Sequence, residues 1–180
     1  MRTRFVSLRN AVIFLALFII NAVVLGQLDK PLEALANGAP KPDLRFGYSP
    51  AELDQIFAAY GEAGRQFYAL NLLVDTPFPI FGGIAGALFV LVAFRDWPWR
   101  KVLAAIPLAF LVTDLIENVL LLGLSQVYPP LSEPIAVAAS LITQIKRAAF
   151  YMTVLLMVIS ALWLVKNFLS RRGKAARQKV

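Results

Sequence analysis

Four long apolar stretches divide this chain of 180 residues. We expect helices over about residues 11–28, 67–94, 102–124 and 141–165, the last with an upstream extension from Ile135. Each meets or approaches the ~20 residues that a helix needs to cross a hydrocarbon core of about 30 Å. With 59% hydrophobic and 16% charged residues, the composition excludes a soluble domain with an ordinary core. The sequence therefore predicts an all-α, polytopic membrane protein whose single domain is a four-transmembrane-helix bundle.

Basic residues predict the orientation of these helices, because loops rich in lysine and arginine stay in the cytoplasm. Twelve of them would fall on one side, at the N-terminus, in the connection at 95–101 and in the tail at 166–180. The connection at 29–66 has four basic residues against six acids. We therefore expect a bacterial cytoplasmic membrane, both termini cytoplasmic and residues 29–66 outside. Orientation and attraction to membrane lipids account for the net charge of +7, so we expect no nucleic acid as a partner.

The chain contains no cysteine and no histidine. Their absence excludes disulfides, thiol catalysis and cysteine metal sites, and it removes the commonest general base and metal ligand. We expect no metal and no cofactor, and the sequence names no catalytic residue. Any chemistry must run on carboxylates, tyrosines, amides and cations.

The long connection contains a helix start, in which Ser49 is the N-cap, Pro50 the first helical residue and Glu52 the closing residue of a capping box. Apolar residues then recur on one face, which predicts an amphipathic helix over about residues 50–63. Such a helix either lies on the outer membrane surface or caps the bundle, where it would serve as a lid over a site.

Polar side chains inside the spans predict a site, since a carboxylate in a membrane helix costs at least ~2.5 kcal/mol and avoids lipid. With a rise of 1.5 Å per residue, Asp75, Asp114 and Glu117 all fall in the outer half of the membrane. Polar residues also share one stripe on each of three helices. We expect one ligand-binding or structural cluster formed by Tyr68, Asn71, Asp75, Asp114, Glu117, Asn118, Gln144, Arg147 and Tyr151.

Arg147 is the cation that we expect to neutralise these acids, because neither sign is tolerated alone in hydrocarbon. Lys146 points about 100° away from it and either joins the cluster or extends outward on its long stem. Three acids against one or two cations leave a surplus carboxylate. Such a group either takes up a proton or awaits a cationic ligand or ion.

Pro77 and Pro79 predict a kink next to Asp75, because each proline removes a backbone hydrogen bond one turn earlier. The glycines at 82, 83 and 86 favour close packing between helices. Asn21, the polar residue of the first span, is interpreted as an interhelical hydrogen bond rather than a site residue.

The four-helix layout over about residues 10–165, the segment LLVDTPFPIFGGIAGALF and the acids of the third span resemble the EXPERA group, which includes sterol isomerases and sigma-2-type receptors. The resemblance implies a lipophilic amine or a sterol-like ligand, contacted by Asp75 and by one of Asp114 or Glu117. The chain departs from the group in having no histidine and in carrying DLIEN in its third span, so whether it is an enzyme stays open. It is also similar to small bacterial four-helix membrane proteins, a resemblance that implies no function.

Three functions stay open from the sequence. The first is binding, or conversion, of a lipophilic small molecule or lipid by the carboxylates. The second is an accessory or structural subunit of a larger membrane complex or homo-oligomer, in which the cluster sets the register of the helices. The third is a proton or cation transporter, against which the lack of an inverted repeat argues.

Overall fold

The computed structural model describes the backbone of residues 5–177 and the side chains of residues 5–170. Its helices are α1 (Leu8–Leu35), η1 (Pro42–Leu44, a 3-10 helix), α2 (Pro50–Asp75), α3 (Pro77–Ala93), α4 (Arg100–Val127) and α5 (Glu133–Arg177). No β-strand occurs between residues 5 and 177. The prediction of an all-α four-helix bundle is confirmed.

Within the described residues, four segments are long and apolar enough to cross a membrane: Leu8–Leu35, Pro50–Ala93, Arg100–Val127 and Glu133–Ser170. The second of these combines α2 and α3. Large apolar side chains cover the outside of the bundle, and Ile20 and Val119 are 61% and 69% exposed. A continuous apolar surface of this kind is favourable in contact with lipid and unfavourable in contact with water. The chain is an integral membrane protein.

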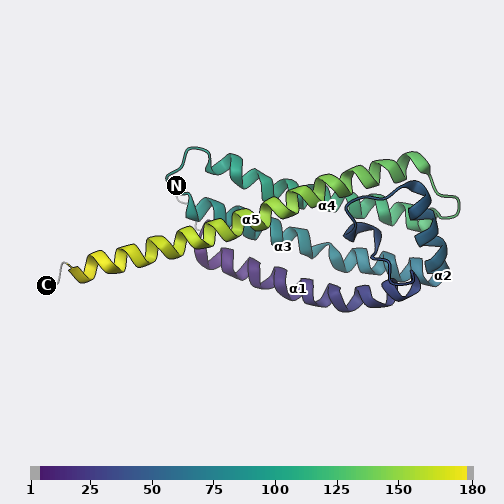
Figure 1. Ribbon diagram of the computed structural model, residues 1–180, viewed down its shortest axis with the longest axis horizontal. Coiled ribbons are helices and arrows are strands. Elements are labelled where there is room, and N and C mark those ends of the chain that lie inside the picture. Colours follow the sequence, from purple (N-terminus) through teal and green to yellow (C-terminus); the bar gives the residue numbers. More distant parts are fainter. Residues whose placement is uncertain (1–4, 178–180) are drawn as a thin grey trace.

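The helix α3 occupies the middle of the bundle, where it packs against α1, α4 and α5. The start of α1, the connection between α3 and α4 and the end of α5 lie at one end, and α2 lies at the other (Figure 1). The far part of α5 extends beyond the bundle. The described parts of the three basic segments therefore share one end of the molecule, which is consistent with the expectation that they lie on one side of the membrane.

Gly83 shows why the helices approach α3 so closely. A Cβ atom at this position would lie 2.7 Å from the Cβ of Leu111 and 2.8 Å from the backbone oxygen of Pro107, both on α4. No side chain fits at those distances, so the glycine permits a close crossing of α3 and α4. This arrangement agrees with the packing role that the sequence indicated.

Thr76 separates the end of α2 from the start of α3, at the place where the two prolines predicted a kink, while its own backbone stays helical with φ −47° and ψ −41°. The side-chain amide of Asn21 on α1 donates a hydrogen bond of 3.3 Å to the backbone oxygen of Val74, one turn before the prolines. The predicted interhelical role of Asn21 is confirmed, since it binds α2 rather than the polar cluster.

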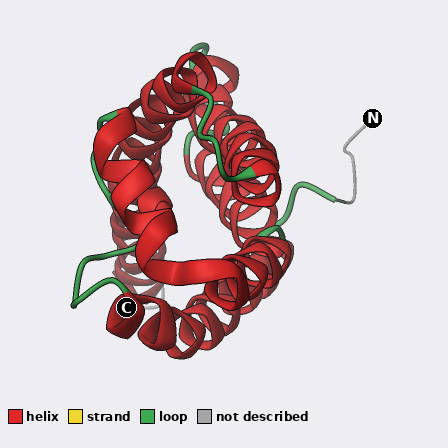
Figure 2. Ribbon diagram, turned by 90° about the vertical axis from the view of Figure 1, so that its right-hand side faces the viewer, coloured by secondary structure: helices red, strands yellow, loops and turns green. Residues whose placement is uncertain are grey.

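The first part of α2 caps the bundle. Its capping box is complete, because Ser49 accepts from the backbone N–H of Glu52 and Glu52 accepts from that of Ser49. At Gly61 the backbone has φ 62°, a conformation that favours glycine, and the chain bends there toward α3. The preceding turns lie across the end of the bundle and bury Leu53 and Phe57 against it (Figures 1 and 2).

Candidate functional site

The predicted acids of the second and third spans lie together in the interior. Asp75 is 6% exposed, Asp114 2% and Glu117 is fully buried. The side-chain amide of Asn118 on α4 donates a hydrogen bond of 3.0 Å to the carboxylate of Asp75 on α2. The structure therefore brings the stripes of α2 and α4 into contact, as helix phase and depth predicted.

The cation beside these acids is Lys146, and the expectation that Arg147 neutralises them is wrong. The Lys146 ammonium forms an ion pair with Glu117 and lies 3.9 Å from Asp114. Arg147 is half-buried, and its guanidinium donates a hydrogen bond of 3.1 Å to the backbone oxygen of Arg45. It forms no ion pair with an acid in the described part of the chain.

The phase of α5 explains this difference. Its buried stripe includes Ala136, Ala139, Ser140, Thr143, Lys146 and Thr153. The small residues of this stripe allow α5 to approach α4, and that contact sets the rotation of the helix. Gln144 is exposed and Tyr151 is 57% exposed, so neither of these two predicted residues belongs to the cluster. The hydroxyl of Thr143 takes part instead by donating to the carboxylate of Glu117.

A second lysine reaches the cluster from the connection between α1 and α2, which the sequence showed only as a loop rich in proline and glycine. Residues 36–49 turn into the bundle there (Figure 1), and Lys41 is 1% exposed. Its ammonium lies 3.1 Å from Asp29, 2.9 Å from Asp43 and 2.9 Å from the side-chain oxygen of Asn71. Asn71 in turn donates a hydrogen bond of 3.0 Å to Asp29. All three ammonium protons of Lys41 therefore have acceptors.

Asp43 joins the two lysines. Its carboxylate binds Lys41 and accepts a hydrogen bond of 3.0 Å from the hydroxyl of Tyr68. Its backbone oxygen accepts a hydrogen bond of 3.0 Å from Lys146. Burial alone would raise the pKa of Asp43, but the charges of Lys41 and Lys146 hold it below its ordinary value of 3.8. Burial alone would lower the pKa of Lys41, but the carboxylates of Asp43, Asp75 and Asp29 raise it above its ordinary value of 10.5.

Counting the buried charged side chains of residues 5–170 shows an excess of acids, with five carboxyl groups against two lysines. They are Asp29, Lys41, Asp43, Asp75, Asp114, Glu117 and Lys146. We call these residues, with Tyr68, Asn71, Asn118 and Thr143, the charged cluster. Low-dielectric surroundings strengthen the mutual repulsion of its acids, so the excess favours an added proton or cation.

The two halves of the cluster differ in how completely their polar atoms are satisfied. Around Lys41 each charged group has close partners. In the other half, the Oδ1 atom of Asp114 and the side-chain oxygen of Asn118 are buried and accept no hydrogen bond from any described residue. Both side chains come from successive turns of α4. A buried acceptor without a donor costs about 1–3 kcal/mol, and more if it is charged.

The residues that the sequence reasoning missed are Asp29, Lys41, Asp43 and Thr143. Asp29 and Lys41 fell in the connection expected outside the membrane, and no periodic pattern links them to α2. Among the described residues, no group of acids is arranged to hold a metal ion.

Comparison with protein-family models, with curated proteins and with solved structures finds no match to this chain. The fold and the site therefore define its class by themselves: an integral membrane protein whose four-helix bundle encloses a cluster of buried charged residues.

Proposed function

We propose that the protein binds a lipophilic molecule through a protonated amine, which sits beside Asp114 and Asn118 in the charged cluster. The observation that carries this proposal is the pair of buried oxygen acceptors on α4 that no described residue satisfies. A protonated amine supplies the N–H donors and the positive charge that Asp114 and Asn118 lack. A neutral ligand supplies at most the donors and leaves the excess of acids uncompensated.

The position of Lys146 supports the same interpretation. Its ammonium contacts Glu117 and the backbone oxygen of Asp43, but it stays 3.9 Å from Asp114. Asp75 forms no ion pair with a described residue, but it accepts the hydrogen bond from Asn118. Asp114 has only the distant Lys146 ammonium and no described hydrogen-bond donor to its buried Oδ1 atom, so it is the least satisfied carboxylate of the cluster. The resemblance of the second span to the EXPERA group favours an amine or a sterol-like ligand at the same acids.

A structural role is the second candidate, and the surroundings of Lys41 favour it. That half of the cluster links α1, the connection and α2 by hydrogen bonds among its own members. It would set the register of these helices with no ligand at all, as a subunit of a larger membrane complex requires.

Thermal unfolding of the purified protein in detergent separates the two candidates. We would compare a hydrophobic tertiary amine with its isostere that has carbon in place of nitrogen. The amine should raise the unfolding temperature by mass action, since a ligand at one hundred times its Kd adds about 2.7 kcal/mol. The substitution Asp114→Asn should remove this shift, and Asp54→Asn, an exposed acid at the same end of the bundle, should retain it.

Equal shifts with the amine and the isostere would contradict the proposal. An amine-specific shift that survives in Asp114→Asn would also contradict it. Either result would leave the structural role as the better explanation of the cluster.

A further inference from the structure

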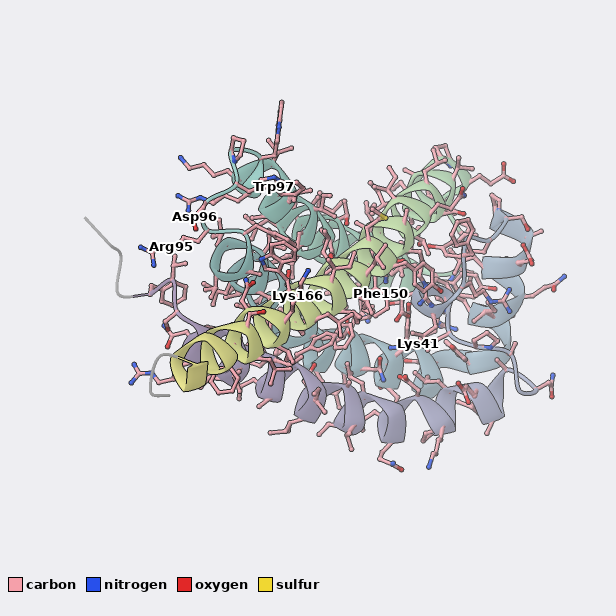
Figure 3. All side chains as sticks on the ribbon, turned by 60° about the vertical axis from the view of Figure 1, so that its left-hand side comes forward. Lys41, Arg95, Asp96, Trp97, Phe150 and Lys166 are labelled. Atoms are coloured by element: carbon pink, nitrogen blue, oxygen red, sulfur yellow. The ribbon has the colours of Figure 1, made fainter. Side chains whose placement is uncertain are left out.

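A second site lies at the opposite end of the bundle from the charged cluster. A hollow of about 950 Å³ opens there between the start of α1, the end of α3, the start of α4 and α5. Figure 3 labels Arg95 and Asp96 at this end and Lys41 far from them. The hollow is therefore independent of the proposed amine site.

The rim of the hollow is strongly basic. Arg95, Arg100 and Lys101 line it, and Asp96 is the acid among its lining residues. The guanidinium of Arg100 donates to the backbone oxygen of Arg95, which holds the connection between α3 and α4 in a tight turn. Within residues 5–170, the side chains of Arg95 and Lys101 have neither an ion pair nor a hydrogen bond. Their charges are available to a ligand.

Helix dipoles add to this charge. Both α1 and α4 begin at the hollow, through Ser7 and Arg100, and only α3 ends there. A helix N-terminus presents backbone N–H groups and about half a positive charge, so the balance of the three ends favours an anion.

The floor of the hollow is apolar. Leu91 and Leu164 line it together with other aliphatic side chains of α3 and the N-terminal segment. Trp97 and Trp99, in the adjacent connection, are 53% and 65% exposed. Exposed tryptophans at the end of a membrane bundle are typical of the level of the lipid headgroups. A phospholipid whose phosphate sat at the rim would thus have its acyl chains against the apolar outer surface of the bundle.

We infer that this hollow binds the headgroup of an anionic phospholipid, with Arg95, Arg100 and Lys101 contacting the phosphate and the apolar floor contacting the glycerol and upper acyl chains. The apolar floor is the reason to expect a phospholipid rather than a free phosphate. Basic pockets between membrane helices bind such headgroups in this manner.

The test uses the full-length protein in mixed micelles, with thermal unfolding and native mass spectrometry as readouts. Phosphatidylglycerol should raise the unfolding temperature by several degrees more than phosphatidylcholine with identical acyl chains, and a bound lipid should survive in the spectrum. The double variant R95Q/K101Q should weaken phosphatidylglycerol binding by about tenfold or more, because two cations are removed from the membrane surface. Arg95→Lys with Lys101→Arg should restore it.

The matched control is R9Q/K166Q, which removes the same charge outside the lining of the hollow. It should keep the preference for phosphatidylglycerol. Equal losses in the two double variants would overturn the inference, since they would show general attraction of a basic surface to anionic lipid. Equal effects of the two lipids would also overturn it, as would full stabilisation by glycerol phosphate alone. Circular dichroism of each variant verifies that it is folded.

Discussion

Lys146, on α5, donates a hydrogen bond of 3.0 Å to the backbone oxygen of Asp43, which lies 103 residues earlier in the chain. The same ammonium pairs with Glu117 on α4. The Lys146 side chain thus links the connection between α1 and α2, α4 and α5 to one another. Among the side chains described, its neighbour Arg147 binds only the backbone oxygen of Arg45, at the edge of the cluster.

Replacing these two cations separately should therefore have very different effects. Lys146→Met leaves Glu117 buried without its cation, which should cost ~3–5 kcal/mol in the free energy of unfolding. Arg147→Met removes one hydrogen bond at a half-buried position and should cost about 1 kcal/mol. Reversible unfolding in mixed micelles measures both. A larger loss for Arg147→Met would mean that the arginine neutralises the acids after all.

Two acids on α4 provide a test of the surplus carboxylate. Glu117 contacts Lys146 and Thr143, whereas Asp114 has no close donor for its Oδ1 atom. Glu117→Gln should therefore destabilise the protein by about 1.5–3 kcal/mol, the worth of hydrogen bonds to a charged group. Asp114→Asn should change the free energy of unfolding by less than about 1 kcal/mol, or raise it, since it reduces repulsion among the acids. The opposite order would remove the distinction between the two halves of the cluster.

Acid should weaken the fold through Asp43. Its pKa is lower in the folded protein than the ordinary value of 3.8, so its contribution to stability is complete above that pH. The contribution is lost as the pH falls through the lowered folded pKa, because protonation breaks the pair with Lys41. In Asp43→Asn the unfolding free energy should be smaller at neutral pH and should fall less below pH 3.8 than in the unchanged chain. Asp54→Asn, at an exposed position, is the control and should keep the original acid dependence.

Glycine substitutions test the packing of α3. Gly83→Ala places a methyl group 2.7 Å from the Cβ of Leu111, and overpacking of this kind costs about 1–3 kcal/mol. Gly123, inside α4, has no atom within 4 Å of its would-be Cβ. Gly123→Ala should therefore be neutral or stabilising by up to about 1 kcal/mol through helix propensity. Equal unfolding temperatures for the two variants would show that α3 and α4 are farther apart.

Membrane orientation is tested by labelling single cysteines in this chain, which has none of its own. We predict that the end capped by α2 faces outward and the end with the basic connections faces the cytoplasm. Ala59→Cys, exposed on α2, should react with an impermeant maleimide in intact cells. Asp96→Cys, exposed between α3 and α4, should react only after the cells are opened. The reverse pattern would invert the orientation of the whole bundle and move the proposed lipid site to the outer leaflet.

Local rules predicted much of this architecture. The length of the apolar stretches determined the all-α bundle, because an isolated backbone in lipid must satisfy its own hydrogen bonds. The prolines at 77 and 79 determined where α2 gives way to α3, and the residues Ser49, Pro50 and Glu52 determined the start of α2. The apolar stretches are continuous in the sequence, and the other two features depend on residues within about one helical turn of one another, so the sequence contains the whole cause.

The sequence pattern alone did not predict which face of α5 is buried. Ser140, Gln144, Arg147 and Tyr151 form a regular polar stripe. Of these four, only Ser140 lies in the buried stripe, which continues through Thr143 and Lys146. Small side chains facing α4 decided between the two, and their effect depends on the shape of the neighbouring helix. Lys146 was an open alternative in the sequence, and only the contact with α4 selected it.

The entry of Lys41 and Asp43 into the bundle was decided by tertiary structure alone. In the sequence they belong to a connection rich in proline and glycine, with the composition of an exposed loop. Their partners Asp29, Asn71, Tyr68 and Lys146 come from α1, α2 and α5. A buried lysine and a buried aspartate are stable only where all these partners meet, and no local pattern encodes a meeting of three helices. The sequence by itself determined the membrane helices and the acids within them, whereas the assembled bundle decided which cations those acids have.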